Sequence, residues 1–212
     1  MNIIPAIDRF INNRCYRYAL LINGKWGSGK TYFIKETLIP HIEKTIHDVN
    51  YLSLYGVKST DEINQMLCLQ TMKNKYPALK SKGGEIFIRG VASVLKGAMN
   101  VIGTGDTGIE KVVELIPNYD KYVIILDDLE RCGCPINEVF GYINNFVEHT
   151  DASVILVANE DEIGKWQLDR DPEMQMLIAM DSMVKVEMPP TMEDYFNEIQ
   201  CQKKKERTVF TP

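Results

Sequence analysis

Gly24-Lys25-Trp26-Gly27-Ser28-Gly29-Lys30-Thr31 decides the fold of this chain, because it matches the G-x-x-x-x-G-K-[ST] phosphate-binding loop at every fixed position. Its glycines let the backbone take turn conformations in which consecutive N–H groups converge on phosphate oxygens. Lys30 would reach the β- and γ-phosphates, and the hydroxyl of Thr31 would bind Mg²⁺. The loop therefore predicts binding of a nucleoside triphosphate through Gly24, Trp26, Gly27, Ser28, Gly29, Lys30 and Thr31.

A strand and a helix are expected on either side of this loop. Residues 18–22 form a short apolar run typical of a buried strand, and from Thr31 to about His47 apolar residues recur at helical spacing. Pro40 would kink or split this helix. Strand, loop and helix follow one another as a phosphate-binding loop requires. A glycine-rich turn without a ligand is the less favoured alternative.

Length and composition are those of a single globular domain. The chain has 212 residues, of which 45% are hydrophobic and 25% charged, and these values suit one α/β domain with a sizeable core. The net charge of −5 and the pI near 5.3 do not indicate nucleic-acid binding, although they leave a local basic patch open. The five cysteines are scattered, and the N-terminus lacks a signal-peptide pattern. We therefore expect a cytoplasmic protein.

Cys132-Gly133-Cys134, with His149 downstream, is a weak candidate for a metal site. A C-x-C pair lacks the second pair of ligands found in the usual zinc spacings. Gly133 and Pro135 are turn residues, and proline is suited to the start of a helix. We therefore favour a tight turn between a strand and a helix.

Strand and helix patterns alternate along the chain. The apolar runs at 122–126 and 153–158 are typical of strands that are buried on both faces of a sheet, whereas residues 184–188 alternate and are expected at an edge. A further strand is predicted at 50–55, and helices are predicted at 5–17, 61–75, 136–149 and 191–205. Such alternation implies a parallel sheet with right-handed crossovers. The sequence therefore predicts an α/β three-layer sandwich with a mostly parallel central sheet.

Two carboxylates directly follow the apolar strand at 122–126. Parallel strands bring their carboxyl ends together at the ligand crevice, and carboxylates beside a phosphate loop are suited to Mg²⁺. Asp127 is therefore the predicted metal-associated residue, together with Thr31. Asp128 is predicted to polarise the water that attacks the γ-phosphate. A solvated strand end is the alternative for this acidic pair.

Two more polar residues complete the set of candidate catalytic residues with Lys30 and Asp128. Asn159 follows the strand at 153–158, where its amide would hydrogen-bond the water or the γ-phosphate; alternatively it only opens a turn. Arg131 would pair with a nearby Asp or Glu, or it would act as an arginine finger toward a neighbouring subunit. The local ion pair is slightly favoured for Arg131.

Residues 85–102 are apolar enough for a membrane span to be considered. Arg89, Lys96 and four glycines within or beside the stretch make it too polar to cross a bilayer. We therefore predict no membrane span, and instead an amphipathic or partner-facing insertion at about 77–117. Residues 103–108 are glycine-rich, follow no strand, and are interpreted as a flexible loop.

The helix at 5–17, the tryptophan-bearing loop and Ile124-Ile125-Leu126-Asp127-Asp128-Leu129-Glu130-Arg131 together resemble the KAP group of P-loop NTPases over nearly the whole chain. The resemblance implies ATP and Mg²⁺, and an extra strand between the phosphate loop and the acidic strand. It implies Asp127 on the metal side and Asp128 in the catalytic acid/base position. It also implies a domain at 1–200 and a role in bacterial anti-phage defence. The basic tail at 201–212 departs from the pattern, because P-loop ATPases of this sort usually continue into a helical lid, and we expect the tail to stop before that lid.

These features together predict an ATP-hydrolysing P-loop enzyme that works as a nucleotide-driven switch, coupled to a protein partner or to its own assembly. The alternative from another class is a nucleotide-dependent interaction module that does not hydrolyse ATP. A small-molecule kinase is less favoured, because the sequence shows neither a second substrate pocket nor an arginine-rich lid. GTP is disfavoured because residues 159–162 do not form the N-K-x-D guanine signature.

Overall fold

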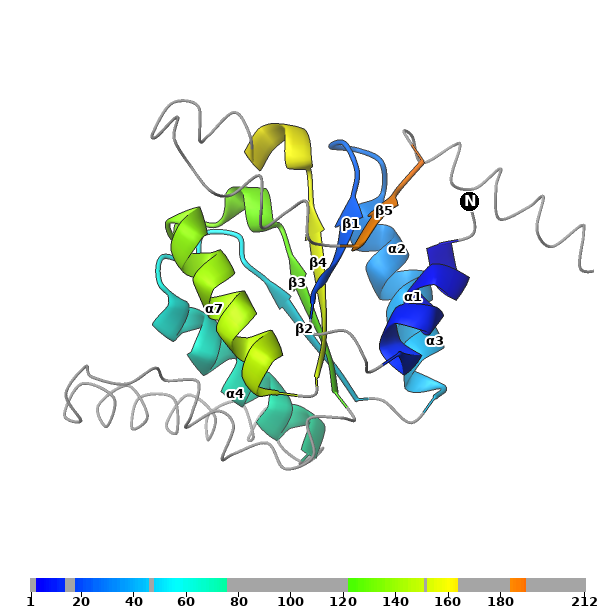
Figure 1. Cartoon of the computed structure of the whole chain (residues 1–212), viewed down its shortest axis with the longest axis horizontal. Helices are drawn as coiled ribbons and strands as arrows, with labels where there is room; N and C mark the ends of the chain where they lie inside the picture. The colour runs from blue at the N-terminus through cyan, green and yellow to red at the C-terminus, as the bar shows by residue number, and fades with distance from the viewer. Residues whose placement is uncertain are drawn as a thin grey trace, which may run out of the picture.

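The computed structural model describes residues 3–13, 18–45, 48–75, 122–150, 152–163 and 184–189. These residues form three layers, with a five-stranded sheet between two groups of helices (Figure 1). The strands are β1 (Leu20–Asn23), β2 (Asp48–Ser53), β3 (Tyr122–Asp127), β4 (Ser153–Ala158) and β5 (Val184–Glu187). The predicted α/β sandwich is therefore confirmed.

The sheet is parallel throughout, with the strand order β2-β3-β4-β1-β5. β1 leads into the phosphate loop and β3 ends in the acidic pair, and each of them pairs with β4. In these registers Leu21 lies beside Leu156, and Ile125 lies beside Ile155. The additional strand that was predicted thus separates the loop strand from the acidic strand, and β5 lies at the predicted edge position.

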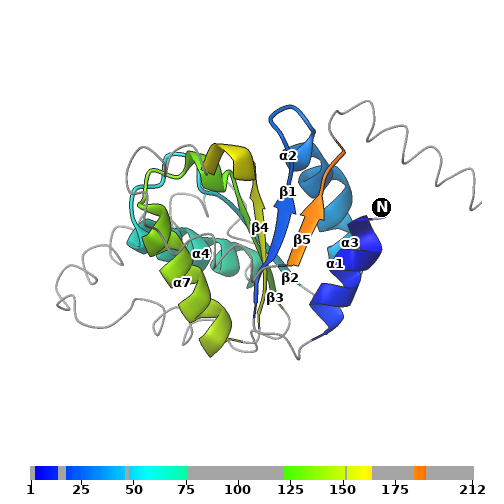
Figure 2. The same cartoon turned by 45° about the horizontal axis from the view of Figure 1, so that its top comes forward.

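Helices cover both faces of the sheet, which explains the unbroken apolar strands. On one face lie α1 (Ile3–Asn12), α2 (Lys30–Phe33) and α3 (Ile39–Glu43), and on the other lie α4 (Thr60–Lys75) and α7 (Ile136–His149) (Figure 2). Successive strand residues point to opposite faces. Val123 and Ile125 accordingly join the core beneath α1 to α3, whereas Ile124 and Leu126 join the core beneath α4 and α7.

The helix after the phosphate loop changes its hydrogen-bonding pattern before Pro40. α2 continues into a π-helical turn, Ile34–Leu38, and then into α3, where Pro40 lies in the first turn. Proline has no N–H group, and its ring clashes with the carbonyl four residues earlier in a regular α-helix. The wider π turn falls where that clash would arise. The helical segment ends at Glu43, before the predicted end at His47.

Several boundaries differ from the sequence prediction. β2 lies about two residues earlier than expected, because the chain turns after Ser53: the N–H of Leu54 donates to the carbonyl of Asp127 (2.8 Å), and Gly56 has a φ of 74°. α1 ends at Asn12 rather than residue 17. The turn predicted between β3 and α7 is present, with the N–H of Gly133 donating to the carbonyl of Val57 (2.7 Å).

Some expectations fall on residues that the structure does not describe. These are the insertion at about 77–117 with the apolar stretch 85–102, the helix at 191–205 and the tail at 201–212. In the described part of the chain, no helix has the length and apolarity needed to cross a membrane.

Candidate functional site

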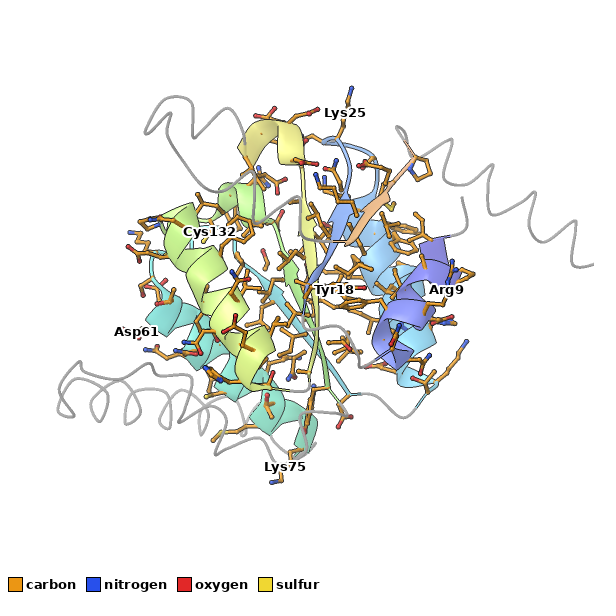
Figure 3. The ribbon with its side chains drawn as sticks, viewed as in Figure 1. Arg9, Tyr18, Lys25, Asp61, Lys75 and Cys132 are labelled. Atoms are coloured by element: carbon orange, nitrogen blue, oxygen red, sulfur yellow. The ribbon has the colours of Figure 1, made fainter. Side chains whose placement is uncertain are left out.

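The phosphate loop at the carboxyl end of β1 takes backbone conformations that require glycine. Gly27 and Gly29 have φ values of 81° and 83°, in the left-handed region that side chains with a Cβ atom resist. Gly24 has no space for a side chain, because an added Cβ would lie 2.8 Å from Ser28 Oγ and 2.9 Å from Met188 Cβ. Lys25 projects from this loop at the edge of the molecule (Figure 3).

Lys30, the first residue of α2, folds back over the loop that precedes it. Its ammonium donates to the carbonyl of Gly24 and, at 3.2 Å, to the carbonyl of Lys25. Burial lowers the pKa of Lys30, and the nearby carboxylates of Glu130, Asp127 and Asp128 oppose this effect. A half-buried cation whose hydrogen bonds go to neutral carbonyls is suited to exchange them for the oxygens of an anion.

Asp127 links the phosphate loop to the end of β3. Its Oδ2 accepts hydrogen bonds from Thr31 Oγ1 (2.9 Å) and from the hydroxyl of Tyr51 in β2 (2.9 Å). Its Oδ1 accepts one from the backbone N–H of Asp128 (2.8 Å). With 1% of its surface exposed, Asp127 is a buried carboxylate that depends on these three donors.

Tyr51 is a residue that the sequence analysis missed. Burial raises its pKa above the ordinary range, and the charge of Asp127 and their hydrogen bond reinforce the shift. The phenol therefore remains a hydrogen-bond donor at neutral pH. The ammonium of Lys35 lies 5.0 Å from the centre of the Tyr51 ring. The alternating pattern of β2 would have placed Tyr51 and Ser53 on one face, but pattern alone gives no sign that this face meets Asp127 and Asp128.

Asp128 has a φ of 60° and is the only non-glycine residue with positive φ in the described part of the chain. Its Oδ2 accepts a hydrogen bond from Ser53 Oγ (2.7 Å), and its carbonyl accepts one from the N–H of Arg131 (2.9 Å). The two carboxylates accept from different side chains, Asp127 from Thr31 and Tyr51 and Asp128 from Ser53. Backbone strain of the kind found at Asp128 clusters at functional sites.

Asn159 follows β4, between the loop strand and the acidic strand. The residue is buried, with 5% of its surface exposed, and its backbone carbonyl accepts hydrogen bonds from the N–H groups of Glu162 (3.1 Å) and Ile163 (3.3 Å). The next residue is tied to the loop strand, because the N–H of Glu160 donates to Asn23 Oδ1 (3.0 Å). Asn159 thus opens a helical turn and also lies at the carboxyl edge of the sheet.

Arg131 lies at the rim of the site. Its guanidinium carbon is 4.8 Å from the centre of the Tyr55 ring, an arrangement typical of a cation–π contact. No ion pair of Arg131 is found among the described residues, so the local contact is aromatic rather than the carboxylate pairing that the sequence favoured. Tyr55 is 65% exposed, which leaves this pair at the surface.

Trp26 and Glu130 form a second link between the phosphate loop and the residues after β3. Trp26 Nε1 donates to Glu130 Oε1 (3.2 Å), although the indole is 61% exposed. The sequence analysis assigned Trp26 to nucleotide binding but gave Glu130 no role. Their contact joins residues 104 positions apart in the chain.

The chemistry of the site fits a magnesium nucleotide. Ser28 Oγ is fully buried and has no hydrogen-bond partner within the described residues, so a donor group in the loop is available to an anion. The hydroxyl of Thr31 and the carboxylate of Asp127 lie side by side and are the hard oxygen ligands that Mg²⁺ prefers. The phosphate loop and the oxygens of Thr31 and Asp127 therefore lie together at the carboxyl edge of the sheet.

One comparison with known proteins, that with family models, supports the P-loop interpretation. A family model described as the KAP family P-loop domain matches residues 2–175. No curated protein matches the chain. Among solved structures, the crystal structure of Cdc6p from Pyrobaculum aerophilum aligns with a TM-score of 0.49 and 13% identity, over 96% of this chain and 47% of that one. The chain thus spans about half the length of that protein.

Proposed function

The chain belongs to the KAP family of P-loop domains, because the family model spans residues 2–175 of its 212 residues, and from this premise we propose that it hydrolyses ATP with Mg²⁺ as a nucleotide-driven switch. The switch would act on a protein partner or on the assembly of this chain with itself. One observation carries the proposal: the hydroxyl of Thr31 and the carboxylate of Asp127 are 2.9 Å apart although they are 96 residues apart in sequence. A loop that only turned the chain would not need this pairing.

The residues of the phosphate loop would bind and orient the triphosphate. Backbone N–H groups of the loop and the hydroxyl of Ser28 would donate to phosphate oxygens. The ammonium of Lys30 would leave the carbonyls of Gly24 and Lys25 for the β- and γ-phosphates. Thr31 and Asp127 would hold Mg²⁺, which when bound neutralises charge on the phosphate oxygens.

The residues at the ends of β3 and β4 would promote hydrolysis. Asp128 would accept a proton from the attacking water, with its carboxylate held by Ser53 Oγ at 2.7 Å. The side-chain amide of Asn159 would donate a hydrogen bond to the γ-phosphate or to the water. Arg131 lies at the exposed rim, where it would reach a neighbouring subunit if the chain assembles.

Phosphate release and nucleotide binding together test this proposal. Lys30→Ala is expected to weaken ATP binding and abolish turnover. Asp128→Asn is expected to bind ATP but to release phosphate at least about a hundredfold more slowly, the usual contribution of a general base. Asparagine is chosen because it tolerates the left-handed backbone of residue 128.

Matched controls separate the site from general effects of charge. Lys44→Ala removes an exposed lysine after α3, and Asp61→Ala removes an exposed aspartate from the first turn of α4. Both controls should turn over ATP like the wild type. Binding without turnover in the wild type would favour the non-hydrolysing interaction module. Equal turnover in the wild type and Asp128→Asn would refute the role of Asp128.

The partner and the pathway need separate measurements. Solution mass with and without ATP tests self-assembly, and an unchanged monomer would remove the reason for Arg131 to act across subunits. The family resemblance motivates a role in bacterial anti-phage defence. Phage plating on cells that express the wild type or Lys30→Ala tests that role, and equal plating efficiency would contradict it.

A further inference from the structure

Glu130 is a buried carboxylate that the proposed mechanism does not use. It lies in the 3-10 turn Leu129–Arg131 after the acidic pair, with 9% of its surface exposed. Its Oε1 accepts the hydrogen bond from Trp26 Nε1 at 3.2 Å. Its Oε2 is buried and has no hydrogen-bond partner in the described part of the chain.

Such an arrangement is costly to the folded protein. A buried charge needs partners that replace water, and an unsatisfied carboxylate oxygen leaves part of that cost uncompensated. Glutamine would accept the same bond from Trp26 without carrying a charge. Glu130 therefore carries a negative charge that its hydrogen bond to Trp26 does not require.

The charge of Glu130 acts on the lysine of the phosphate loop. Among the carboxylates that raise the pKa of Lys30 against the effect of burial, Glu130 contributes most, ahead of Asp127 and Asp128. The geometry agrees, because the ammonium of Lys30 bonds the carbonyl of Lys25 and the next residue, Trp26, bonds Glu130. The same carboxylate is also bonded to Trp26, in the middle of the loop.

We infer that Glu130 is a positioning residue that anchors the phosphate loop through Trp26 and serves as a counter-charge with which the triphosphate must compete for Lys30. This inference rests on the proposed nucleotide-binding function. The hydrogen bond fixes the loop, while the charge weakens nucleotide binding. A switch benefits from both effects, because it must recognise the nucleotide and also release it.

Two substitutions separate the hydrogen bond from the charge. Glu130→Gln keeps an oxygen that accepts from Trp26 but removes the charge, whereas Glu130→Ala removes both. The chain has two tryptophans, so a Trp166→Phe background leaves Trp26 as the only indole. Glu43→Gln, an exposed glutamate at the end of α3, makes the same chemical change away from the loop.

Calorimetric titration with Mg·ADP and the emission spectrum of Trp26 provide the two readouts. Glu130→Gln should bind Mg·ADP roughly tenfold more tightly than the background protein, as expected for removing one unit charge beside the half-buried Lys30. Glu43→Gln should bind as the background does. The emission spectrum of Trp26 in Glu130→Ala should differ from that of the background protein, whereas the spectrum in Glu130→Gln should match it.

The outcomes distinguish this inference from the function on which it rests. If the background protein binds no nucleotide, the proposed function fails and the inference fails with it. If it binds Mg·ADP but Glu130→Gln has the same affinity, the counter-charge is refuted while the proposed function stands. Identical Trp26 emission in Glu130→Ala and the background protein would refute the anchoring of the loop.

Discussion

Tyr51→Phe tests whether the buried carboxylate of Asp127 depends on a donor from the neighbouring strand β2. The substitution removes one hydroxyl and keeps the ring, including its contact with Lys35. Asp127 would then keep two donors, Thr31 Oγ1 and the backbone N–H of Asp128. We expect a loss of stability and no change of fold.

The magnitude follows from the burial and charge of the acceptor. A hydrogen bond to a charged group contributes about 1.5–3 kcal/mol, more than a bond between neutral groups. Asp127 is only 1% exposed, so water cannot readily replace the lost hydroxyl. Tyr51→Phe should therefore lower the free energy of unfolding by about 1.5–3 kcal/mol.

Urea denaturation followed by circular dichroism measures this change. Tyr55→Phe is the matched control: Tyr55 is 65% exposed and its ring lies against Arg131, so its loss of a hydroxyl should change stability by less than about 0.5 kcal/mol. A double-mutant cycle with Asp127→Asn isolates the pair. A coupling energy below about 0.5 kcal/mol would refute the argument, since residues in one hydrogen-bond network are expected to couple more strongly.

Three further predictions concern stability. Gly27→Ala should destabilise the protein by about 1–2 kcal/mol in urea denaturation through backbone strain alone, because φ is 81° and no atom lies within 4 Å of an added Cβ. Gly141→Ala, equally uncrowded but in α7, should stabilise it by about 0.5–1 kcal/mol in the same assay. Burial raises the pKa of Cys68 from 9.0 to about 11, so this thiol's contribution to stability is present below about pH 9 and is lost as the pH rises toward about 11. Between about pH 9 and pH 11, the midpoint of urea denaturation should therefore fall less steeply with pH in Cys68→Ala than in the wild type.

The sequence predicted the sheet well because its strands are strongly patterned. The runs at 122–126 and 154–158 are apolar at every position, and a sheet covered on both faces buries such strands. The ends of elements were less predictable. β2 was placed about two residues late because its end depends on a hydrogen bond from Leu54 to the distant Asp127, which no local pattern encodes.

The same distinction between local pattern and distant contacts applies to the residues of the candidate site. The phosphate loop has fixed spacing, so its residues were named from sequence and remain proposals for nucleotide binding. Tyr51, Ser53 and Glu130 were not predicted, because each acts through a contact with a residue at least 75 positions away. Arg131 was expected to form an ion pair, but an exposed aromatic neighbour lies beneath it instead. Contacts that depend on tertiary packing leave little trace in one sequence.

The backbone of Asp128 has a consequence for how this protein can change over time. A glycine would adopt the φ of 60° without steric cost, so an aspartate here makes the folded chain less stable than it needs to be. Selection for stability alone would favour the glycine, whereas the catalytic role proposed for the carboxylate beside Ser53 would oppose it. Variants of this chain that lack the proposed hydrolysis should therefore drift toward glycine at position 128 and gain stability.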